Sequence, residues 1–330
     1  MNQAQNLIKI QGLDAIPIPT CNIGHDISAN ELWKKDGFTY LRCPTCGLMW
    51  VSPQLTDESV SEIYATEYKN KQGKHPIYPG KRRFREGLSY ISPYRTNGGR
   101  LLDVGTFTGH FLVAAREDGW AVVEGTEISR AAADYALNEY NLSLHIGDLS
   151  SLDLEENAYD AITLSDVIEH VSNPLTTIQK AHHLLRDGGV LYMHTPHFNS
   201  IPRYIYGQNW SVFFPWHRTI FTAKAMRLML EENGFHVKTL QTLSILPLGT
   251  QSAWQRYLQQ KELQTGETNP MTSNNLPKSK NIGLRNLLRP IWLGTKRAIE
   301  LPFIPLSAMG IYLGSRLVVC AEKTKHPSKP

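Results

Sequence analysis

The sequence of 330 residues predicts an α/β protein built on one doubly wound sheet. Three observations support this prediction. From residue 100 onward, short apolar runs alternate with segments of helical period. The stretch LLDVGTFTGHF at residues 101–111 opens this alternation as a strand, a loop with two glycines and the start of a helix. Ahead of it, three of the four cysteines lie within the first fifty residues beside a histidine, which favours a small metal-binding module.

The N-terminal segment carries two pairs of metal-ligand side chains. Cys21 and His25 form the first pair, and Cys43 and Cys46 form the second in a Cys-Pro-x-Cys-Gly turn. Such a turn directs two thiolates at one centre, and a second pair completes the tetrahedral set that structural zinc prefers. We therefore predict that residues 1–55 are a zinc-ribbon-like module of their own, in which the metal supplies folding energy. Reduced, buried cysteines beside an unrelated histidine are the alternative.

The remaining elements follow in order along the chain. Residues 56–99 are a helical lead-in with helices expected at 56–68 and 81–91, joined by a linker at 69–80. The sheet core spans residues 100–242. Its strands are expected at 100–104, 121–127, 143–146, 159–165, 189–195 and 235–242, and its helices at 109–118, 129–140, 174–186 and 222–233. A seventh strand is expected at 316–323, and residues 324–330 are a tail.

A helical, basic insert at residues 243–315 interrupts the pattern before the last strand. Its segment 277–300 mixes Leu and Ile with Arg and Lys. A helix there is expected to cover the core or the acceptor with a solvated basic face, and peripheral contact with an anionic membrane is the alternative. No window offers the ~20 apolar residues of a membrane-spanning helix, and the N-terminus lacks a secretory pattern, so we expect a cytoplasmic protein. A net charge of +4 is too mild to predict a nucleic-acid partner.

The loop after the first core strand lies where open parallel sheets bind their ligands. A dinucleotide fingerprint would need glycine at three positions where this chain has Gly105, Phe107 and His110. The second of those glycines lets the backbone approach a pyrophosphate, so Phe107 argues against NAD or FAD. What remains is Asp103, Gly105 and Gly109, a loop that can pass under an adenosine without cradling phosphates. S-adenosylmethionine (SAM), which has no phosphate, is such a ligand.

Acidic residues at the ends of the next strands suit the rest of that ligand. Glu127 closes the second strand, where its carboxylate is expected to accept hydrogen bonds from both ribose hydroxyls. A dinucleotide would use the same acid, so Glu127 does not choose between the two ligands. Asp148 follows the third strand, where an acid can accept from an adenine amino group. The fourth strand leads through Ser165 into SDVIEH, beside the expected sulfonium end.

Six pieces of sequence in order resemble the class I SAM-dependent methyltransferases. They are LLDVGTFTGHF, VVEGTEIS, GDL, YDAITLSDVIEHVSNP, LLRDGGVLYMHTP and LMLEENGF. The resemblance implies a Rossmann-like fold and methyl transfer to a small-molecule acceptor. It also implies a SAM site formed by Asp103, Gly105, Thr106, Gly109, Glu127, Ile128, Asp148, Leu149 and Ser165.

The N-terminal pieces YLRCPTCGLMWVSPQ and IYATEY are similar to the zinc-binding segment ahead of some methyltransferases, including deoxysugar C-methyltransferases. This resemblance implies a structural zinc on Cys21, His25, Cys43 and Cys46. It suggests a sugar nucleotide or glycan intermediate as the acceptor, with a quinone-like or lipid acceptor as the alternative.

SDVIEH resembles a stretch that ubiquinone-pathway O-methyltransferases associate with a divalent metal. It implies Asp166, Glu169 and His170 as ligands, and the alternative is that Glu169 and His170 line the pocket without metal. Histidine titrates nearest neutrality, so His170, His194 and His217 are candidate general bases, with a structural role as the alternative for each. His217 lies in the aromatic segment NWSVFFPWHRTIF, which we expect to cover the acceptor.

Other function classes remain as alternatives. An NAD-dependent oxidoreductase would need the loop glycines that this chain lacks. A zinc-ribbon nucleic-acid binder would need a continuous basic face with exposed aromatic residues. A fold that binds SAM without catalysis is the third.

Overall fold

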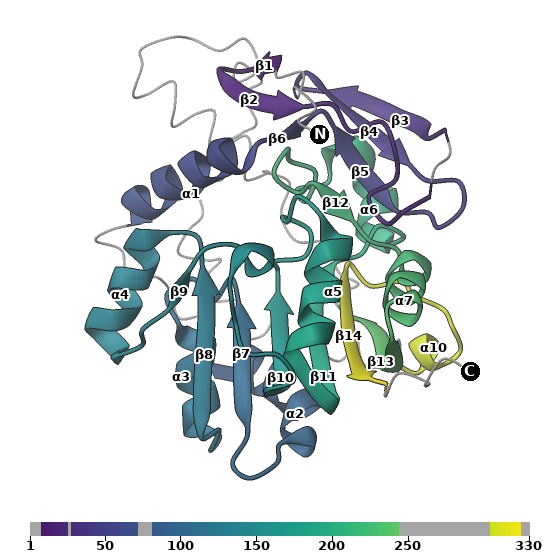
Figure 1. Cartoon of the computed structure of the whole chain (residues 1–330). Coiled ribbons are helices and arrows are strands. Elements are labelled where there is room, and N and C mark those ends of the chain that lie inside the picture. Colours follow the sequence, from purple (N-terminus) through teal and green to yellow (C-terminus); the bar gives the residue numbers. More distant parts are fainter. Residues whose placement is uncertain (1–7, 26–27, 72–80, 244–303, 325–330) are drawn as a thin grey trace, which may run out of the picture.

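A seven-stranded sheet forms the centre of the molecule (Figure 1). The computed structural model describes residues 8–25, 28–71, 81–243 and 304–324. Across the sheet the strands are β13 (Phe235–Leu243), β14 (Arg316–Lys323), β11 (Leu185–Pro196), β10 (Tyr159–Ser165), β7 (Arg100–Val104), β8 (Val122–Glu127) and β9 (His145–Ile146). Strands β7 to β11 pair in parallel, and β14 runs antiparallel to both its neighbours. The predicted α/β class and the predicted seven strands are confirmed.

Helices cover both faces of this sheet, and side chains alternate between two cores. Leu102 and Ile162 belong to a core beneath α5 (Pro174–Leu184) and α7 (Ala223–Glu232). Their chain neighbours Leu101 and Ala161 belong to a second core beneath α2 (Lys81–Ile91) and α3 (His110–Glu117). This is the period of two expected of a strand that is buried on both sides.

Several of the helices begin at a side chain that satisfies one of their first amides, whereas α3 begins at Gly109 without such a cap. Ser129 accepts a hydrogen bond from the Ala132 N–H at the start of α4 (Arg130–Tyr140), and Thr222 does the same for α7. Both are residue types that favour this position because their short side chains reach the free N–H groups. The side chain of Asn173 caps α5 in the same way. Each predicted core helix is present and begins within two residues of its expected start.

Two small antiparallel sheets precede the core. One contains β1 (Ile8–Ile10), β2 (Leu13–Ile16) and β6 (Gln54–Leu55). The other contains β3 (Asn30–Lys35), β4 (Phe38–Arg42), β5 (Met49–Ser52) and β12 (Thr219–Ile220). In Figure 1 these sheets lie above the end of the central sheet at which β7, β8 and β10 finish.

The N-terminal segment shares its cores with the rest of the chain. We expected a module of its own, but β12 comes from the core region and pairs with β5. Leu48 and Trp50 are buried in the same core as Met226 of α7. A segment this short gains most apolar burial by packing onto the larger domain.

The aromatic segment after α6 (Ile201–Tyr206) and a short 3₁₀ helix (Gly207–Asn209) builds the second of these shared cores. Trp210, Phe213 and Trp216 are each buried with Phe38 and Tyr40 of β4. These aromatic side chains pack the N-terminal sheets onto the rest of the chain. The expectation that the segment also covers the acceptor stays a prediction.

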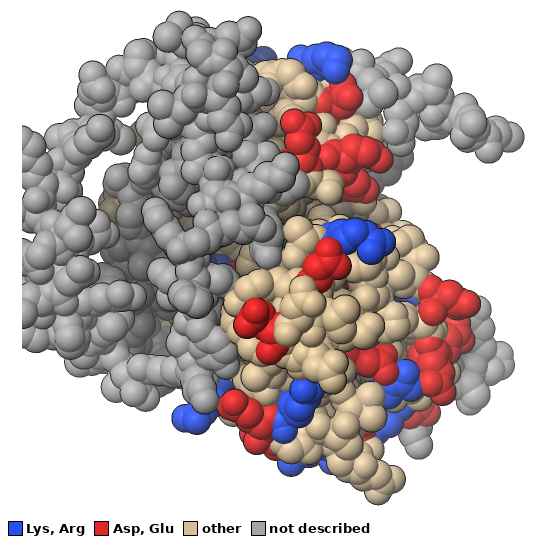
Figure 2. Space-filling model, turned by 90° about the vertical axis from the view of Figure 1, so that its left-hand side faces the viewer, with Lys and Arg blue, Asp and Glu red and all other residues tan. Residues whose placement is uncertain are grey.

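Helix α1 (Asp57–Lys71) runs from the N-terminal sheets toward α4 (Figure 1). Two further 3₁₀ helices span Ser92–Tyr94 and Leu149–Ser151, and the short helix α10 spans Ile304–Ala308. The basic segment 277–300, most of the linker 69–80 and most of the tail lie outside the described residues. Among the described helices, none has the length and apolar character needed to cross a bilayer. Figure 2 shows the side of the molecule that carries α4, where acidic and basic side chains are mixed.

Candidate active site

The loop after β7 adopts backbone angles that most residues avoid. Gly105 and Gly109 have φ values of 63° and 78°, and Phe107 between them has 54°. A Cβ on Gly105 would lie 2.7 Å from a methyl group of Val167, so this position needs glycine. Phe107 has no such freedom, and its conformation costs free energy on the order of 1 to 2 kcal/mol. Its backbone N–H donates to Glu127 Oε2 at 2.8 Å, which offsets this cost.

Glu127 holds the loop against the end of β8. Its Oε2 accepts from the Phe107 N–H, and its Oε1 accepts from the Ser129 N–H, also at 2.8 Å. The side chain is buried, and burial raises the pKa of this carboxyl while the backbone amides lower it. A carboxylate has about four lone-pair sites, so two remain after these bonds.

Asp103 lies at the point where the direction of strand order changes. It sits on β7 directly opposite Thr163 of β10, and the Thr163 hydroxyl donates to Asp103 Oδ1 at 2.5 Å. Burial raises the pKa of Asp103 to about 6. In open parallel sheets the crevice at this reversal binds the ligand.

The residues expected around an adenine line the neighbouring strand ends. Asp148 follows β9, and its Oδ1 accepts from the Ser150 N–H at 2.9 Å. The Gly147 N–H donates to the Glu127 carbonyl at 3.0 Å, which ties this loop to β8. Ile128 leaves 42% of its surface exposed beside Glu127, whereas Leu149 is fully buried. An exposed, branched apolar side chain next to a carboxylate is better suited to contact with a nucleoside than to contact with water.

The predicted SAM residues therefore gather at one edge of the sheet. Asp103, Gly105 and Glu127 come from the ends of β7 and β8, and Ser165 ends β10. Thr106 is buried, and its N–H donates to the Thr126 carbonyl at 3.0 Å. Their assignment as a SAM site stays a prediction, because no ligand contact tests it.

Asp166 takes part in a different group from the one that its motif implies. It has a left-handed φ of 57°, and its Oδ1 lies 3.1 Å from His194 Nδ1 and 2.5 Å from an Arg316 guanidinium nitrogen. The resemblance of the motif implies that Asp166 shares a divalent metal with Glu169 and His170. The Arg316 and His194 side chains draw its carboxylate toward β14 and β11 instead.

The side chain that does converge with Glu169 and His170 is His217. Ligand atoms of these three residues all lie within 4.8 Å of one another, and the two imidazole rings are 4.6 Å apart. The Nδ1 atoms of His170 and His217 lie 2.8 Å from the carbonyls of Trp216 and Val212. Since a carbonyl only accepts, each Nδ1 carries the proton, and each Nε2 has a lone pair.

Burial governs the protonation of this cluster. It raises the pKa of Glu169 to about 8, with the nearby Asp166 adding to the effect. It lowers the pKa of His170 to about 4 and places that of His217 well below the ordinary range. Of the three candidate bases, His170 and His217 thus lie together, and His194 lies apart with Asp166.

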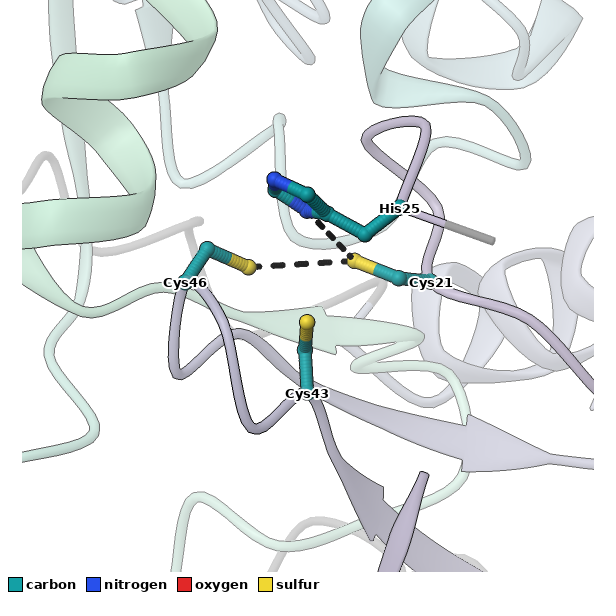
Figure 3. Close-up of side chains that lie close together, drawn as sticks. All are labelled: Cys21, His25, Cys43 and Cys46. Carbon is teal, nitrogen blue, oxygen red and sulfur yellow. Dashed lines mark hydrogen bonds between the residues drawn. The ribbon is translucent and has the colours of Figure 1, made fainter. Parts of the chain in front are cut away.

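The four predicted zinc ligands also converge (Figure 3). Cys21 Sγ lies 3.8 Å from Cys46 Sγ and 3.7 Å from His25 Nδ1. A tetrahedral zinc with ordinary bond lengths places two thiolates about 3.8 Å apart and a thiolate and imidazole about 3.6 Å apart. Cys43 points toward the same centre in Figure 3. The residues present fit the ion that their spacing predicts.

Two side chains at the site were not foreseen. Arg316 reaches Asp166 from the first residue of β14, and the Thr195 hydroxyl donates to Glu169 Oε2 at 2.9 Å. Thr195 directly follows the candidate base His194 near the end of β11, so its position in the sequence could have indicated that it lies at the site. Nothing near Arg316 in the sequence connects it with a residue 150 positions earlier.

Comparison with known proteins identifies the domain. Residues 78–240 match the profile of a family described as a methyltransferase domain. Residues 78–240 thus carry a match to a methyltransferase domain, and this matched region includes the loop after β7 and the ends of β8 and β10.

Relatives of this methyltransferase domain include the protein named ubiquinone biosynthesis O-methyltransferase in Coxiella burnetii. It is 30% identical over 141 residues, which cover 40% of this chain and 57% of that protein. A protein of the same name in Haemophilus ducreyi is 33% identical over 109 residues, covering 30% of this chain and 45% of that protein. The chain thus spans about half the length of these relatives. The solved structure of the 4+2 cyclase SpnF shares the fold, with a TM-score of 0.50 and 17% identity over 82% of this chain and 98% of that one.

Proposed function

We propose that this protein transfers the methyl group of SAM to a small-molecule acceptor. The observation that carries the proposal is the bond pair that Glu127 makes to the Phe107 and Ser129 amides. These two bonds hold an acidic side chain beside a loop in which Phe107 occupies the position where a pyrophosphate would need glycine. The lone pairs that remain on Glu127 suit two ribose hydroxyls, and Asp148 and the exposed Ile128 suit the adenine.

When bound, SAM supplies a methyl group on a positively charged sulfur that any well-placed nucleophile can attack. The chain's contribution is to position the acceptor and to remove its proton where needed. His194 is the base that the geometry favours. Asp166 orients its Nδ1 at 3.1 Å, which is the arrangement of a base held by a carboxylate.

Calorimetry with SAM and, separately, with NADH tests the cofactor. We expect binding of SAM only, and a loss of at least about tenfold in affinity for Glu127→Gln, since an amide cannot accept both N–H bonds. Glu139→Gln, an exposed change on α4, is the matched control. Binding of NADH without SAM would contradict the proposal.

The acceptor class is proposed from similarity. The N-terminal Cys-Pro-x-Cys-Gly segment resembles that of deoxysugar C-methyltransferases, which favours a sugar nucleotide or glycan intermediate. The name of the C. burnetii relative favours a quinone-like acceptor instead. Incubation with SAM and each acceptor class, followed by mass spectrometry for a gain of one methyl group, separates them.

Single-turnover rates test the base. We expect His194→Ala to slow methyl transfer about 100-fold or more, the contribution typical of general-base catalysis. His183→Ala, an exposed histidine on α5, is the control. An unchanged rate for His194→Ala would remove His194 from this role.

We also propose that Cys21, His25, Cys43 and Cys46 bind a structural zinc ion. The support is the agreement of the two ligand separations, 3.7 and 3.8 Å, with tetrahedral zinc. Four protein ligands leave no open position, so this ion holds the fold and takes no part in the reaction.

A further inference from the structure

We propose that Glu169, His170 and His217 bind a second metal ion, a divalent first-row transition metal held by two imidazoles and one carboxylate. This cluster lies apart from the Cys21 group and uses none of its residues. The inference does not depend on methyl transfer, because metal binding can be measured without SAM or an acceptor.

The two histidines are arranged as metal ligands usually are. A ligating imidazole normally donates its second nitrogen to a carbonyl or carboxylate, which fixes the tautomer and the ring orientation. Here the Nδ1 atoms of His170 and His217 donate to the carbonyls of Trp216 and Val212 at 2.8 Å. The two Nε2 lone pairs are thereby left facing the same carboxylate oxygen, Glu169 Oε1, each at 4.0 Å.

Glu169 Oε1 needs a partner that the described part of the chain does not supply. The side chain is 1% exposed, and its other oxygen accepts from the Thr195 hydroxyl. Oε1 has no hydrogen-bond partner among the described residues, and both nearby imidazole nitrogens are acceptors. At 4.0 Å these atoms are too far apart to form a hydrogen bond with one another, even when the carboxyl carries a proton. A buried polar atom left without a partner costs on the order of 1 to 3 kcal/mol. A cation at that point would satisfy all three.

The distances and donor atoms indicate the class of ion. Bonds of about 2.0 to 2.2 Å to nitrogen and oxygen place tetrahedral neighbours about 3.4 Å apart, so a shift of roughly half an ångström closes the site. Imidazole ligands suit zinc, iron, nickel and copper better than magnesium or calcium, which prefer oxygen. Three protein ligands leave at least one position open, and His170 keeps 17% of its side chain exposed, so the site is not sealed.

The ligand set differs from the one that the SDVIEH motif implies. In this chain Asp166 is held by Arg316 and His194, and His217 arrives from 47 residues beyond His170 to take the third place. The packing of the aromatic segment against β4 brings His217 there. This difference gives the experiment its control variant. Asp166→Asn removes a ligand that only the motif implies, whereas Glu169→Gln removes a ligand of the cluster that the structure brings together.

Titration of the purified full chain with Co²⁺ distinguishes the two metal sites. Cobalt bound by thiolates gives intense near-ultraviolet charge-transfer absorption, whereas a site of nitrogen and oxygen ligands gives only weak visible bands. We expect the wild type to bind one equivalent of each kind. Glu169→Gln and His217→Asn should weaken the nitrogen and oxygen site at least about 100-fold, more than loss of a supporting residue does, and leave the thiolate site unchanged.

Asp166→Asn should keep both equivalents. Retention of the thiolate spectrum in each variant shows that the chain is folded, so a missing second equivalent then reports the site alone. The proposal is overturned if the wild type binds no second equivalent, or if Asp166→Asn weakens this site as much as Glu169→Gln. Neither result would bear on SAM binding, which calorimetry measures separately.

Discussion

Phe107 is the residue on which the prediction of the ligand depends most. It stands where a pyrophosphate would need a glycine, so it argues against a dinucleotide. Its backbone still adopts a left-handed φ of 54°, because the Glu127 carboxylate accepts its N–H. The sequence predicts Gly105, Glu127 and Asp148 at strand ends, since each follows an apolar run. It does not predict the hydrogen bond between Glu127 and the loop, which depends on how the two strands are placed side by side.

His197 provides a test of pH dependence. It is 1% exposed, its Nδ1 donates to the Gly314 carbonyl at 3.0 Å, and burial lowers its pKa to about 4. Between pH 6.5 and 4 the unfolded chain binds a proton here that the folded chain does not, so stability falls as the pH falls through this window. The full effect of one such group is about 3 kcal/mol.

We expect His197→Asn to reduce this loss, because the asparagine amide can donate to the same carbonyl without titrating. Urea unfolding at several pH values between 4 and 7 measures the slope. His183→Asn, at an exposed position, controls for the removal of a histidine in general. Equal slopes in wild type and His197→Asn would show that His197 does not resist protonation.

At the level of elements, regular periodicity explains what could be predicted. The central strands and helices were predicted because each buries a stripe of side chains at a period of 2 or 3.6 residues. Strand β12 has two residues, too few for any period. Its role comes from its partners, since it pairs with β5 and its Thr219 N–H donates to the Glu169 carbonyl at 3.2 Å. This short strand fixes the segment that carries His217.

The start of α1 is tied to the same segment by an ion pair. Arg218 is almost fully buried, and its guanidinium lies 2.6 Å from Asp57 Oδ1 and donates to the Leu55 carbonyl at 2.8 Å. Asp57 is 69% exposed, so solvent weakens the pair. We expect Asp57→Asn to lower stability by about 1 kcal/mol, since Arg218 keeps its charge and loses its partner.

Glu58→Gln is the matched control, because it removes a charge from the same first turn of α1 without touching Arg218. Thermal unfolding of the two variants separates a specific pair from a general effect of acids at a helix start. Equal destabilisation by both would assign the effect to the helix dipole.

At the scale of the whole molecule, the sequence predicts the individual parts better than the way in which they pack together. The cysteine spacing correctly brings Cys21, His25, Cys43 and Cys46 to one centre. What it could not convey is that this centre belongs to the main core, where Cys43 and Cys46 are buried with Leu164 and Met226. Sharing of a core depends on shape and contact across more than a hundred residues, and neither leaves a local pattern.

This shared core predicts how the protein responds to loss of the proposed zinc ion. Removal of that ion with a chelator should lower the melting temperature of the whole chain in one transition, because the described N-terminal strands share their core with the central sheet. Calorimetry with and without chelator measures this, and Cys43→Ser should reproduce the effect. Cys320→Ala, at a buried cysteine outside the cluster, is the control. Two separate transitions would contradict the shared core.

The order of strands also constrains how the chain is made. β14 lies between β11 and β13, although residues 316–323 follow β13 by more than seventy positions. During synthesis β11 and β13 therefore emerge long before the strand that joins them, and each exposes an unpaired edge in the meantime. A nascent chain in this state is a candidate for chaperone binding. β11 and β13 gain their shared partner only after residue 323 has been synthesised.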